Sequence, residues 1–503
     1  MLSRTTTVSF QGIDTIKVTV EVQVASGLPA FKIVGLADKS VAESSERVRG
    51  ALTSMGLALP AKRITVNLAP ADVTKDGSHF DLPIAVGLLS AMGIIPPEEI
   101  ENYVVLGELG LGGEIAPVAG ILPAAMAANQ YEKGIICPKT QGAEALWSGN
   151  TNILPVSGLL EIINHFKGVQ IVAPPEAMPM TSSISVPDFK DVKGQETAKR
   201  AMEIAAAGGH NLLMIGPPGS GKSMLASRFA GILPPLSTEE ILQISVIHSV
   251  AGLLKDGELI TTRPFRSPHH SASMPALVGG GLKAKPGEIS LAHNGVLFLD
   301  ELPEFSRQAL EALRQPMESH VLSVARVNNH VTYPAKFQSI AAMNPCPCGY
   351  FGTPGHECAR APRCAEAYQS KISGPLFDRI DIHVDVPAVL PFELTRLPDG
   401  ESSEEIRNRV LKARQLQANR YIGQEFSDNA HVSDSVLQRV AALDDEGRTI
   451  LEQACEKFHL SARGYHRILR VSRTIADLAG SENISAIHIK EALSFRRIHL
   501  KEK

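Results

Sequence analysis

The chain has 503 residues, a length that accommodates about three domains that each bury a full core. Its 44% hydrophobic and 20% charged residues are the ordinary balance of a soluble globular protein. The net charge of −4 excludes a surface that is basic overall, so any nucleic-acid-binding surface must be local.

The chain contains no segment that suits a membrane. Its longest uncharged apolar stretches, residues 82–97 and 115–131, are interrupted by Gly and Pro. Both are also shorter than the roughly 18 clean residues of a membrane span. The N-terminus lacks the apolar segment of a signal peptide, which predicts a cytoplasmic protein.

Residues 1–171 mix short β-type runs with Ala-rich helical stretches. We expect strands over residues 15–24, 63–67 and 103–107, and helices over residues 39–55, 83–92 and 122–131. This mixture predicts an α/β or α+β domain. Residues 172–187, which are rich in Pro and Ser, are the expected linker to the next domain.

A glycine-rich turn follows the predicted strand at residues 211–215. Its residues are Gly216, Pro217, Pro218, Gly219, Ser220, Gly221, Lys222 and Ser223. Such a loop turns its backbone N–H groups onto phosphate at the N-terminus of a helix. Lys222 would then reach the β- and γ-phosphates, and the Ser223 hydroxyl would bind Mg²⁺. The motif predicts ATP binding.

Two further predicted strands end in polar residues that suit hydrolysis. Residues 296–299 lead to Asp300, which suits the water shell of Mg²⁺, and to Glu301, which suits polarising the attacking water. Residues 338–343 lead to Asn344, whose amide would orient that water. The alternative is an asparagine that opens the turn before Pro345. Together with the phosphate loop, these residues predict an ATP hydrolase over residues 188–386.

The stretch between Lys222 and Asp300 is longer than one strand–helix–strand unit needs, so it contains an insertion. Residues 275–287 are expected to form a helix interrupted by a loop that carries Lys283 and Lys285. Residues 321–333, which include Arg326, predict a hairpin just before the Asn344 strand.

Four cysteines follow Asn344 within nineteen residues: Cys346, Cys348, Cys358 and Cys364. In a cytoplasmic chain this density favours metal over disulfides. Four thiolates suit a closed, structural Zn²⁺ site, with His356 as a substitute ligand. The alternative is a loop of reduced thiols.

A Pro-rich connection over residues 387–401 leads to residues 402–503, where the periodicity predicts helices over residues 402–421 and 433–478. The last 43 residues hold nine Lys/Arg against four Asp/Glu. This basic end is either a solvated helical face or an anion-binding surface.

The phosphate loop, the Asp300–Glu301 strand, the Asn344 strand and the Asp-Arg-Ile-Asp segment at residues 378–381 resemble an AAA+ ATPase of the helix-2-insert, magnesium-chelatase-like group. The resemblance implies that Asn344 is the first sensor, Arg379 the arginine finger and Arg463 the second sensor. Arg467, Arg470 and Arg473 lie on neighbouring helical faces and are the alternatives to Arg463.

An arginine finger acts on the ATP of a neighbouring subunit, so the resemblance implies a homo-oligomeric ring, expected to be a hexamer. It also implies that the two inserted segments point into the pore, where Lys283, Lys285 and Arg326 would contact DNA. The alternative is that both segments are solvated loops.

The Asn-Pro-Cys-Pro-Cys-Gly segment at residues 344–349 and residues 373–379 narrow the resemblance to the ComM/YifB family. The match runs nearly end to end. It implies a bacterial, cytoplasmic, hexameric DNA helicase that promotes branch migration during recombination, notably in natural transformation. No sequence-specific DNA recognition is expected, because phosphate contacts carry no sequence information.

Residues 75–83 and 107–122 resemble the segments of Lon-type proteases that carry the nucleophile and the lysine base. Here the serine position holds His79, and the lysine position falls near Leu122. Without an amine beside a hydroxyl there is no activated nucleophile, so the domain is expected to lack protease activity. Ser78 lies one residue early. Assembly or DNA contact is the expected role of this domain.

The predicted architecture is α/β throughout its ATPase core: a Lon-protease-like α+β domain, an AAA+ P-loop core with a parallel sheet, and a C-terminal helical lid over residues 402–503. Two alternatives to a DNA motor stay open. One is an ATPase subunit that drives metal insertion through a protein partner, as in magnesium chelatase. The other, an ATP-dependent protease, is disfavoured by His79 and Leu122.

Overall fold

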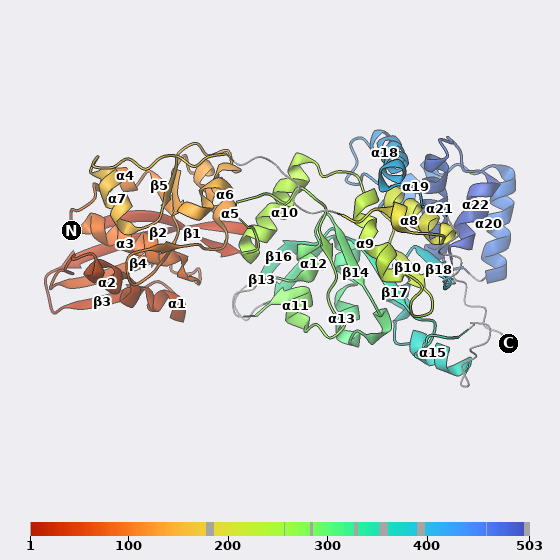
Figure 1. The fold of residues 1–503 in the computed structure, drawn as a ribbon, viewed down its shortest axis with the longest axis horizontal. Helices are drawn as coiled ribbons and strands as arrows, with labels where there is room; N and C mark the ends of the chain where they lie inside the picture. The colour runs from red at the N-terminus through yellow and green to blue at the C-terminus, as the bar shows by residue number, and fades with distance from the viewer. Residues whose placement is uncertain are drawn as a thin grey trace.

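A computed structural model describes residues 2–177, 186–255, 257–281, 285–325, 330–351, 361–389, 398–458 and 460–496. Figure 1 shows an N-terminal sheet and its helices at one end, a central sheet in the middle and the C-terminal helices at the other end. Within the described residues, no helix is long and apolar enough to cross a membrane.

The N-terminal part is built on a seven-stranded sheet in the order β3-β4-β2-β1-β5-β8-β9. These strands are β1 (Leu2–Gln11), β2 (Asp14–Ala25), β3 (Ala30–Val34), β4 (Arg63–Ala69), β5 (Tyr103–Val105), β8 (Gly134–Pro138) and β9 (Ile153–Val156). A short ladder pairs β6 (Glu108–Leu109) with β7 (Ile115–Ala116). The helices are α1 (Lys39–Ala42), α2 (Ser44–Ser54), α3 (Asp81–Ala91), α4 (Pro97–Ile100), α5 (Ile121–Gln130), α6 (Gly142–Leu146) and α7 (Leu159–Phe166).

The strands and helices predicted in this part are present, but the structure adds elements that were not predicted, among them β1, β3, β8, β9, α4, α6 and α7. The helix expected over residues 39–55 is divided at Glu43 into α1 and α2, and α1 is capped by the Asp38 carboxylate, which accepts a hydrogen bond from the Val41 N–H at 2.8 Å. Strand β1 was not expected, since its buried positions include Ser3, Thr5 and Thr7 and thus give no hydrophobic alternation.

The central sheet has five parallel strands in the order β11-β14-β17-β10-β18. They are β11 (Phe265–Arg266), β14 (Val296–Leu299), β17 (Gln338–Met343), β10 (Leu212–Ile215) and β18 (Ile382–Asp385). Every residue of β10, β14 and β17 is buried, as expected for a parallel sheet covered on both faces. Helices α8 (Glu196–Gly208) and α9 (Lys222–Ile232) flank β10 in the chain.

The insertions predicted around this sheet are confirmed. Helices α11 (Met274–Val278) and α12 (Glu288–Leu291) are separated by the short pair β12 (Gly279–Gly280) and β13 (Lys285–Pro286). The hairpin is β15 (Val321–Ala325) and β16 (His330–Pro334). A further helix, α10 (Thr238–Ala251), lies between α9 and β11 and faces the N-terminal part (Figure 1). Short helices α13 (Arg307–Ala312), α14 (Pro316–Ser319), α15 (Arg363–Gln369) and α16 (Gly374–Phe377) complete this part.

The C-terminal helices share a hydrophobic core with one face of the central sheet. They are α18 (Ser403–Arg420), α19 (Asp434–Val440), α20 (Asp445–Phe458), α21 (Ala462–Leu478) and α22 (Ala486–Ser494). Their Val410 and Ile475 belong to the same buried cluster as Leu212 of β10 and Ala201 of α8. The helices are therefore attached to the sheet over a wide apolar area.

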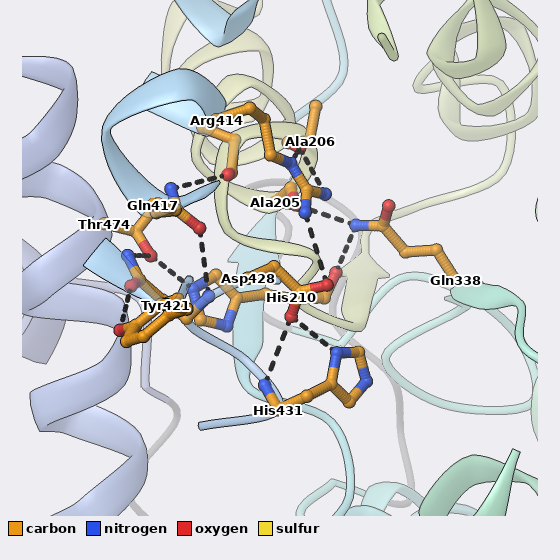
Figure 2. A network of polar contacts seen from close by, with 12 residues as sticks. Ala205, Ala206, His210, Gln338, Arg414, Gln417, Tyr421, Asp428, His431 and Thr474 are labelled. Carbon is orange, nitrogen blue, oxygen red and sulfur yellow. Dashed lines mark hydrogen bonds and ion pairs between the residues drawn. The ribbon is translucent and has the colours of Figure 1, made fainter. Parts of the chain in front are cut away.

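Polar side chains complete this attachment at the C-terminal end of α8 (Figure 2). The carbonyls of Ala205 and Ala206 accept hydrogen bonds from the Gln338 amide at 2.8 Å and from the Arg414 guanidinium at 2.9 Å. Helix-terminal carbonyls have no partner within the helix, so these side chains satisfy them. Because α8 ends just before β10 begins, the C-terminal helices sit at the amino end of β10.

Buried ion pairs hold the C-terminal part together internally. Burial alone would raise the pKa of Asp428, but His431 and Arg414, at 2.5 and 3.3 Å, outweigh it and hold that pKa below its usual range. Arg473 and Asp477, 3.0 Å apart on α21, are almost completely buried. Removing one partner of such a pair costs about 3–5 kcal/mol, so the packing within the C-terminal part is strongly specified.

Candidate functional site

The segment at residues 216–221 leaves the carboxyl end of β10 and enters α9. Gly219 and Gly221 have φ of +76° and +91°, the left-handed region that glycine adopts without strain. A side chain at Gly216 would collide with the Val386 carbonyl. The glycines are therefore required by the backbone path, which is the path predicted for a phosphate loop.

The Lys222 ammonium lies over this loop and is only 8% exposed. It donates hydrogen bonds to the carbonyls of Gly216 and Pro217, both at 2.9 Å, and to the Asn344 side-chain oxygen at 3.3 Å. Burial lowers the pKa of Lys222, while Asp300 and Glu301 oppose that shift. A buried ammonium held by neutral oxygens is well placed to bind an anionic phosphate.

Ser223 and Asp300 form the part of the site that suits a divalent cation. The Ser223 hydroxyl donates a hydrogen bond to Oδ2 of Asp300 at 2.7 Å. Hydroxyl and carboxylate oxygens are hard ligands of the kind Mg²⁺ prefers, so the two side chains fit this ion. When bound there, Mg²⁺ would neutralise charge that develops on the β- and γ-phosphate oxygens.

The backbone of Glu301 has an unusual conformation, because its φ of +51° is in the left-handed region. For a non-glycine residue this costs on the order of 1–2 kcal/mol. Its side chain is about half exposed, and Oε2 lies 3.2 Å from Nδ1 of His270. The strain turns the carboxylate out of the strand end, where water can reach it.

His270 was missed by the sequence analysis. It lies in the loop after β11, and β11 is a neighbour of β14 in the sheet, which brings the imidazole to Glu301. The signal was the adjacent His269–His270 pair, but nothing local links it to a carboxylate 31 residues later.

Arg379 and Arg463 do not join these residues. Both line a cavity of about 570 Å³ at the amino edge of the sheet. The Arg379 carbonyl accepts a hydrogen bond from Asn211, which precedes β10, whereas Gly216 follows it. A strand rises about 3.3 Å per residue, so the step from Asn211 to Gly216 spans roughly 16 Å. Neither arginine is at the phosphate loop of its own chain.

The cavity is rich in arginine nitrogens that lack a partner. Arg379 Nε, Arg467 Nη1 and Arg470 Nε are buried and make no hydrogen bond to any described residue. Glu318 pairs with Arg379, and Asp434 lies 2.8 Å from Arg470. Arg473, by contrast, forms an ion pair with Asp477 and donates hydrogen bonds to the carbonyls of Ser481 and Glu482. Arg473 is therefore structural, and Arg463, Arg467 and Arg470 remain as candidates for the second sensor.

The cysteine segment packs against the phosphate loop. Gly349 approaches Pro218 so closely that a side chain there would collide with the proline ring. The Cys346 and Cys348 sulfurs are 3.2 Å apart, and Cys364 lies on α15. Cys358 lies outside the described residues, and the described ones contain no group of three or more metal-ligating side chains. The zinc site stays a prediction.

The remaining predicted residues are the lysines and the arginine of the two inserted segments and the residues of the protease-like segments. Lys283 and Arg326 are outside the described residues, whereas Lys285 is exposed on β13. The Ser78 hydroxyl contacts the Glu108 carboxylate, and Nε2 of His79 lies 3.0 Å from the Val8 carbonyl. Leu122 is fully buried.

Comparison with known proteins identifies relatives along most of the chain. The description "Magnesium chelatase, subunit ChlI" matches residues 188–394, "Subunit ChlI of Mg-chelatase" matches residues 20–141, and "Magnesium chelatase, subunit ChlI C-terminal" matches residues 400–496. The chain is 43% identical to competence protein ComM of Haemophilus influenzae over 96% of this chain and 95% of that protein. It is 42% identical to the uncharacterized protein YifB of Escherichia coli over 97% of this chain and 95% of that protein.

Two further similarities are partial. An archaeal Lon protease of Halobacterium salinarum is 42% identical over 64 residues, which is 12% of this chain and 9% of that protein. The magnesium-chelatase 67 kDa subunit of Chlorobaculum parvum is 28% identical over 161 residues, which is 31% of this chain and 23% of that protein.

Two substitutions separate nucleotide binding from hydrolysis. Lys222→Ala removes the buried ammonium and is expected to abolish ATP binding in a fluorescent-nucleotide titration. Glu301→Gln keeps the shape of the side chain but not its charge, so it is expected to retain binding and lower the turnover number by about 10²-fold or more. The controls are Lys39→Ala and Glu46→Gln, two exposed side chains on α1 and α2. Turnover at the wild-type rate in Glu301→Gln would remove Glu301 from the reaction.

Proposed function

The chain belongs to the ComM/YifB family of magnesium-chelatase-like ATPases, and on that basis we propose that it is an ATP-driven ring motor that moves branched or single-stranded DNA. In this proposal residues 188–386 are the ATPase core, residues 402–503 the lid and residues 1–171 a docking domain without protease activity. The motor would promote branch migration in recombination or natural transformation, in the cytoplasm.

The position of Arg379 is the observation that supports a ring. It lies about one strand length from the phosphate loop of its own chain, at the opposite edge of a rigid parallel sheet. A guanidinium contributes most where the transferred phosphoryl group develops charge. Arg379 can take that position only on the ATP of a neighbouring subunit. The unpartnered nitrogens of Arg467 and Arg470 beside it support an anion arriving from outside the chain.

Hydrolysis would then use groups from two subunits. Lys222 and the loop N–H groups hold the phosphates, Ser223 and Asp300 hold Mg²⁺, and Glu301 orients and polarises the attacking water. Asn344, at the end of β17 and within hydrogen-bond distance of Lys222, would sense the bound phosphate by direct contact. The neighbour's Arg379 stabilises the charge on the leaving oxygens. Each ATP therefore couples two adjacent subunits.

The assignment to DNA rests on the extent of the similarity. The relative named as a competence protein covers nearly the whole chain at 43% identity, whereas the magnesium-chelatase subunit covers 31% of it at 28% identity. The three family descriptions all name the chelatase subunit, so metal insertion through a protein partner is the second candidate.

A synthetic four-way junction tests the proposal. The wild-type protein is expected to resolve the junction into its arms with ATP and Mg²⁺ but not with a non-hydrolysable analogue, and junction or single-stranded DNA is expected to raise its ATPase rate. Glu301→Gln is the matched inactive control. No effect of any DNA on the ATPase rate, together with binding to a metal-chelatase partner, would reverse the choice between the two candidates.

Mixing two inactive variants tests action between subunits. Arg379→Ala alone is expected to lower ATPase turnover by about 10³-fold or more. Mixed with Lys222→Ala, it should regain up to about a quarter of wild-type activity, because a random ring joins each intact phosphate loop to an intact Arg379 at one interface in four. A mixture of Lys222→Ala with Glu301→Gln regains nothing, since both defects lie in the same subunit's site. Failure of the first mixture to regain activity would show that Arg379 does not act on the ATP of a neighbouring subunit.

We also propose that the four cysteines bind one structural Zn²⁺. The close approach of the Cys346 and Cys348 sulfurs and the packing of Gly349 on Pro218 support this, because a rigid knuckle would hold the phosphate loop in place. Purified protein is expected to contain about one zinc per chain by elemental analysis, and Cys346→Ser to lose it. Cys137→Ser, at a buried lone cysteine, is the control. Metal-free wild-type protein with full ATPase activity would rule the site out.

A further inference from the structure

The N-terminal part meets the ATPase part at a joint that the proposed function does not use. The turn between β1 and β2, at Gly12 and Ile13, reaches into the ATPase part. Ile13 packs against the cluster of Val324, Val331 and Tyr333 on the β15–β16 hairpin. It also packs against the cluster of Leu122, Val246 and Leu259, in which Val246 belongs to α10. Ile13 is the residue shared by both clusters.

The second cluster is reinforced by buried hydrogen bonds. Glu144 of α6 accepts a hydrogen bond from the Ser249 hydroxyl of α10 at 2.6 Å and one from the Leu122 N–H at 3.1 Å. The Gly120 N–H donates to the Ser249 carbonyl at 3.0 Å, and the Trp147 indole donates to the Gly257 carbonyl at 3.0 Å. Buried and hydrogen-bonded contacts of this kind fix one relative position of two surfaces.

The cleft that resembles a protease active site faces the same joint. Asp76, Ser78 and His79 line one side of a cavity of about 250 Å³, and Lys285, Val331 and Tyr333 of the two inserted segments line the other. Leu122, near the position of the protease lysine, makes the contact with Val246 and Leu259. An apolar side chain there stabilises the joint, whereas a lysine would have to be buried without a partner.

We propose that the N-terminal part is a socket for the ATPase of its own chain: it holds the β15–β16 hairpin and α10 in one position, and through this contact the response of the ATPase to DNA depends on the N-terminal part. The dependence of the DNA response on the N-terminal part rests on the proposed function, whereas the holding of the hairpin and α10 does not. One wall of the cleft is therefore formed by inserted segments of the same chain. The hairpin can move only if the β1–β2 turn moves with it or if the contact between the turn and the hairpin breaks.

Gly12 allows a test with a matched control. Its φ is +68°, and a Cβ there would lie 2.6 Å from Cγ1 of Val331 and 3.2 Å from the Thr332 carbonyl oxygen. Gly56 has φ +74° and open space around the same position. Gly12→Ala and Gly56→Ala therefore carry the same backbone strain, but only the first pushes on the hairpin. Ile13→Asp, with Leu28→Asp at an exposed turn of the same sheet as its control, removes the apolar contact directly.

The full-length protein is measured in two ways. Hydrogen exchange at residues 330–333 is expected to become about tenfold faster in Gly12→Ala and Ile13→Asp, with α3 unchanged as proof that the N-terminal part stays folded. The basal ATPase rate is expected to stay within about twofold of wild type, because the phosphate loop is distant, while stimulation by four-way-junction DNA is lost. Gly56→Ala and Leu28→Asp should match the wild type in both measurements.

Each outcome decides one part of the inference. Unchanged exchange at the hairpin in both Gly12→Ala and Ile13→Asp would overturn the holding contact. Faster exchange with undiminished DNA stimulation would overturn the coupling. A wild-type protein that no DNA stimulates would instead overturn the proposed function, and with it the coupling, while the exchange measurement would still decide whether the socket holds the hairpin.

Discussion

The five strands of the central sheet run in the same direction, and this polarity decides where every functional group of the ATPase lies. The carboxyl ends of β10, β14 and β17 meet at one edge, so Lys222, Asp300 and Asn344 come together although they are far apart in the chain. The amino ends meet at the other edge, where Arg379 lies beside Asn211. A rigid sheet cannot bring the two edges together. In the proposed ring, the two edges would be half-sites that meet those of neighbouring subunits.

The C-terminal helices reinforce this division. Arg414 and Gln417 satisfy carbonyls at the end of α8, and Asp428 and Asp477 are held in buried ion pairs. The hydrogen bonds from Arg414 (Figure 2) and Gln417 to the end of α8 place the helices at the amino edge. Arg463 and its neighbours line the same cavity there as Arg379. Because a half-satisfied buried network is costly, the helices have little freedom to swing over the phosphate loop of their own chain.

The N-terminal part follows a different principle. Its resemblance to a protease survives in the segment from Lys75 to Pro83, yet the groups around its cleft now serve packing: Leu122 is buried against α10, and Tyr333 forms part of the cavity wall. The contacts around the cleft are therefore apolar burial and a few buried hydrogen bonds between the N-terminal part and the ATPase part.

The sequence by itself determined the local chemistry. A glycine-rich turn after a strand, two carboxylates after another strand and an asparagine after a third identify Lys222, Asp300, Glu301 and Asn344, because each motif depends on a few consecutive residues and on the direction of one strand. The sequence also located the β15–β16 hairpin, the interrupted helix and the approximate bounds of α3, α5 and α18 from periodicity. It did not locate β1, whose buried face is Ser and Thr.

Only the tertiary structure decided which groups meet across long distances in the chain. The contact of His270 with Glu301, the gathering of Arg463, Arg467 and Arg470 around Arg379, and the insertion of Ile13 between α10 and the hairpin all depend on strand order and on the packing of whole surfaces. Such contacts arise from the sum of many weak apolar interactions, and no short stretch of residues encodes that sum.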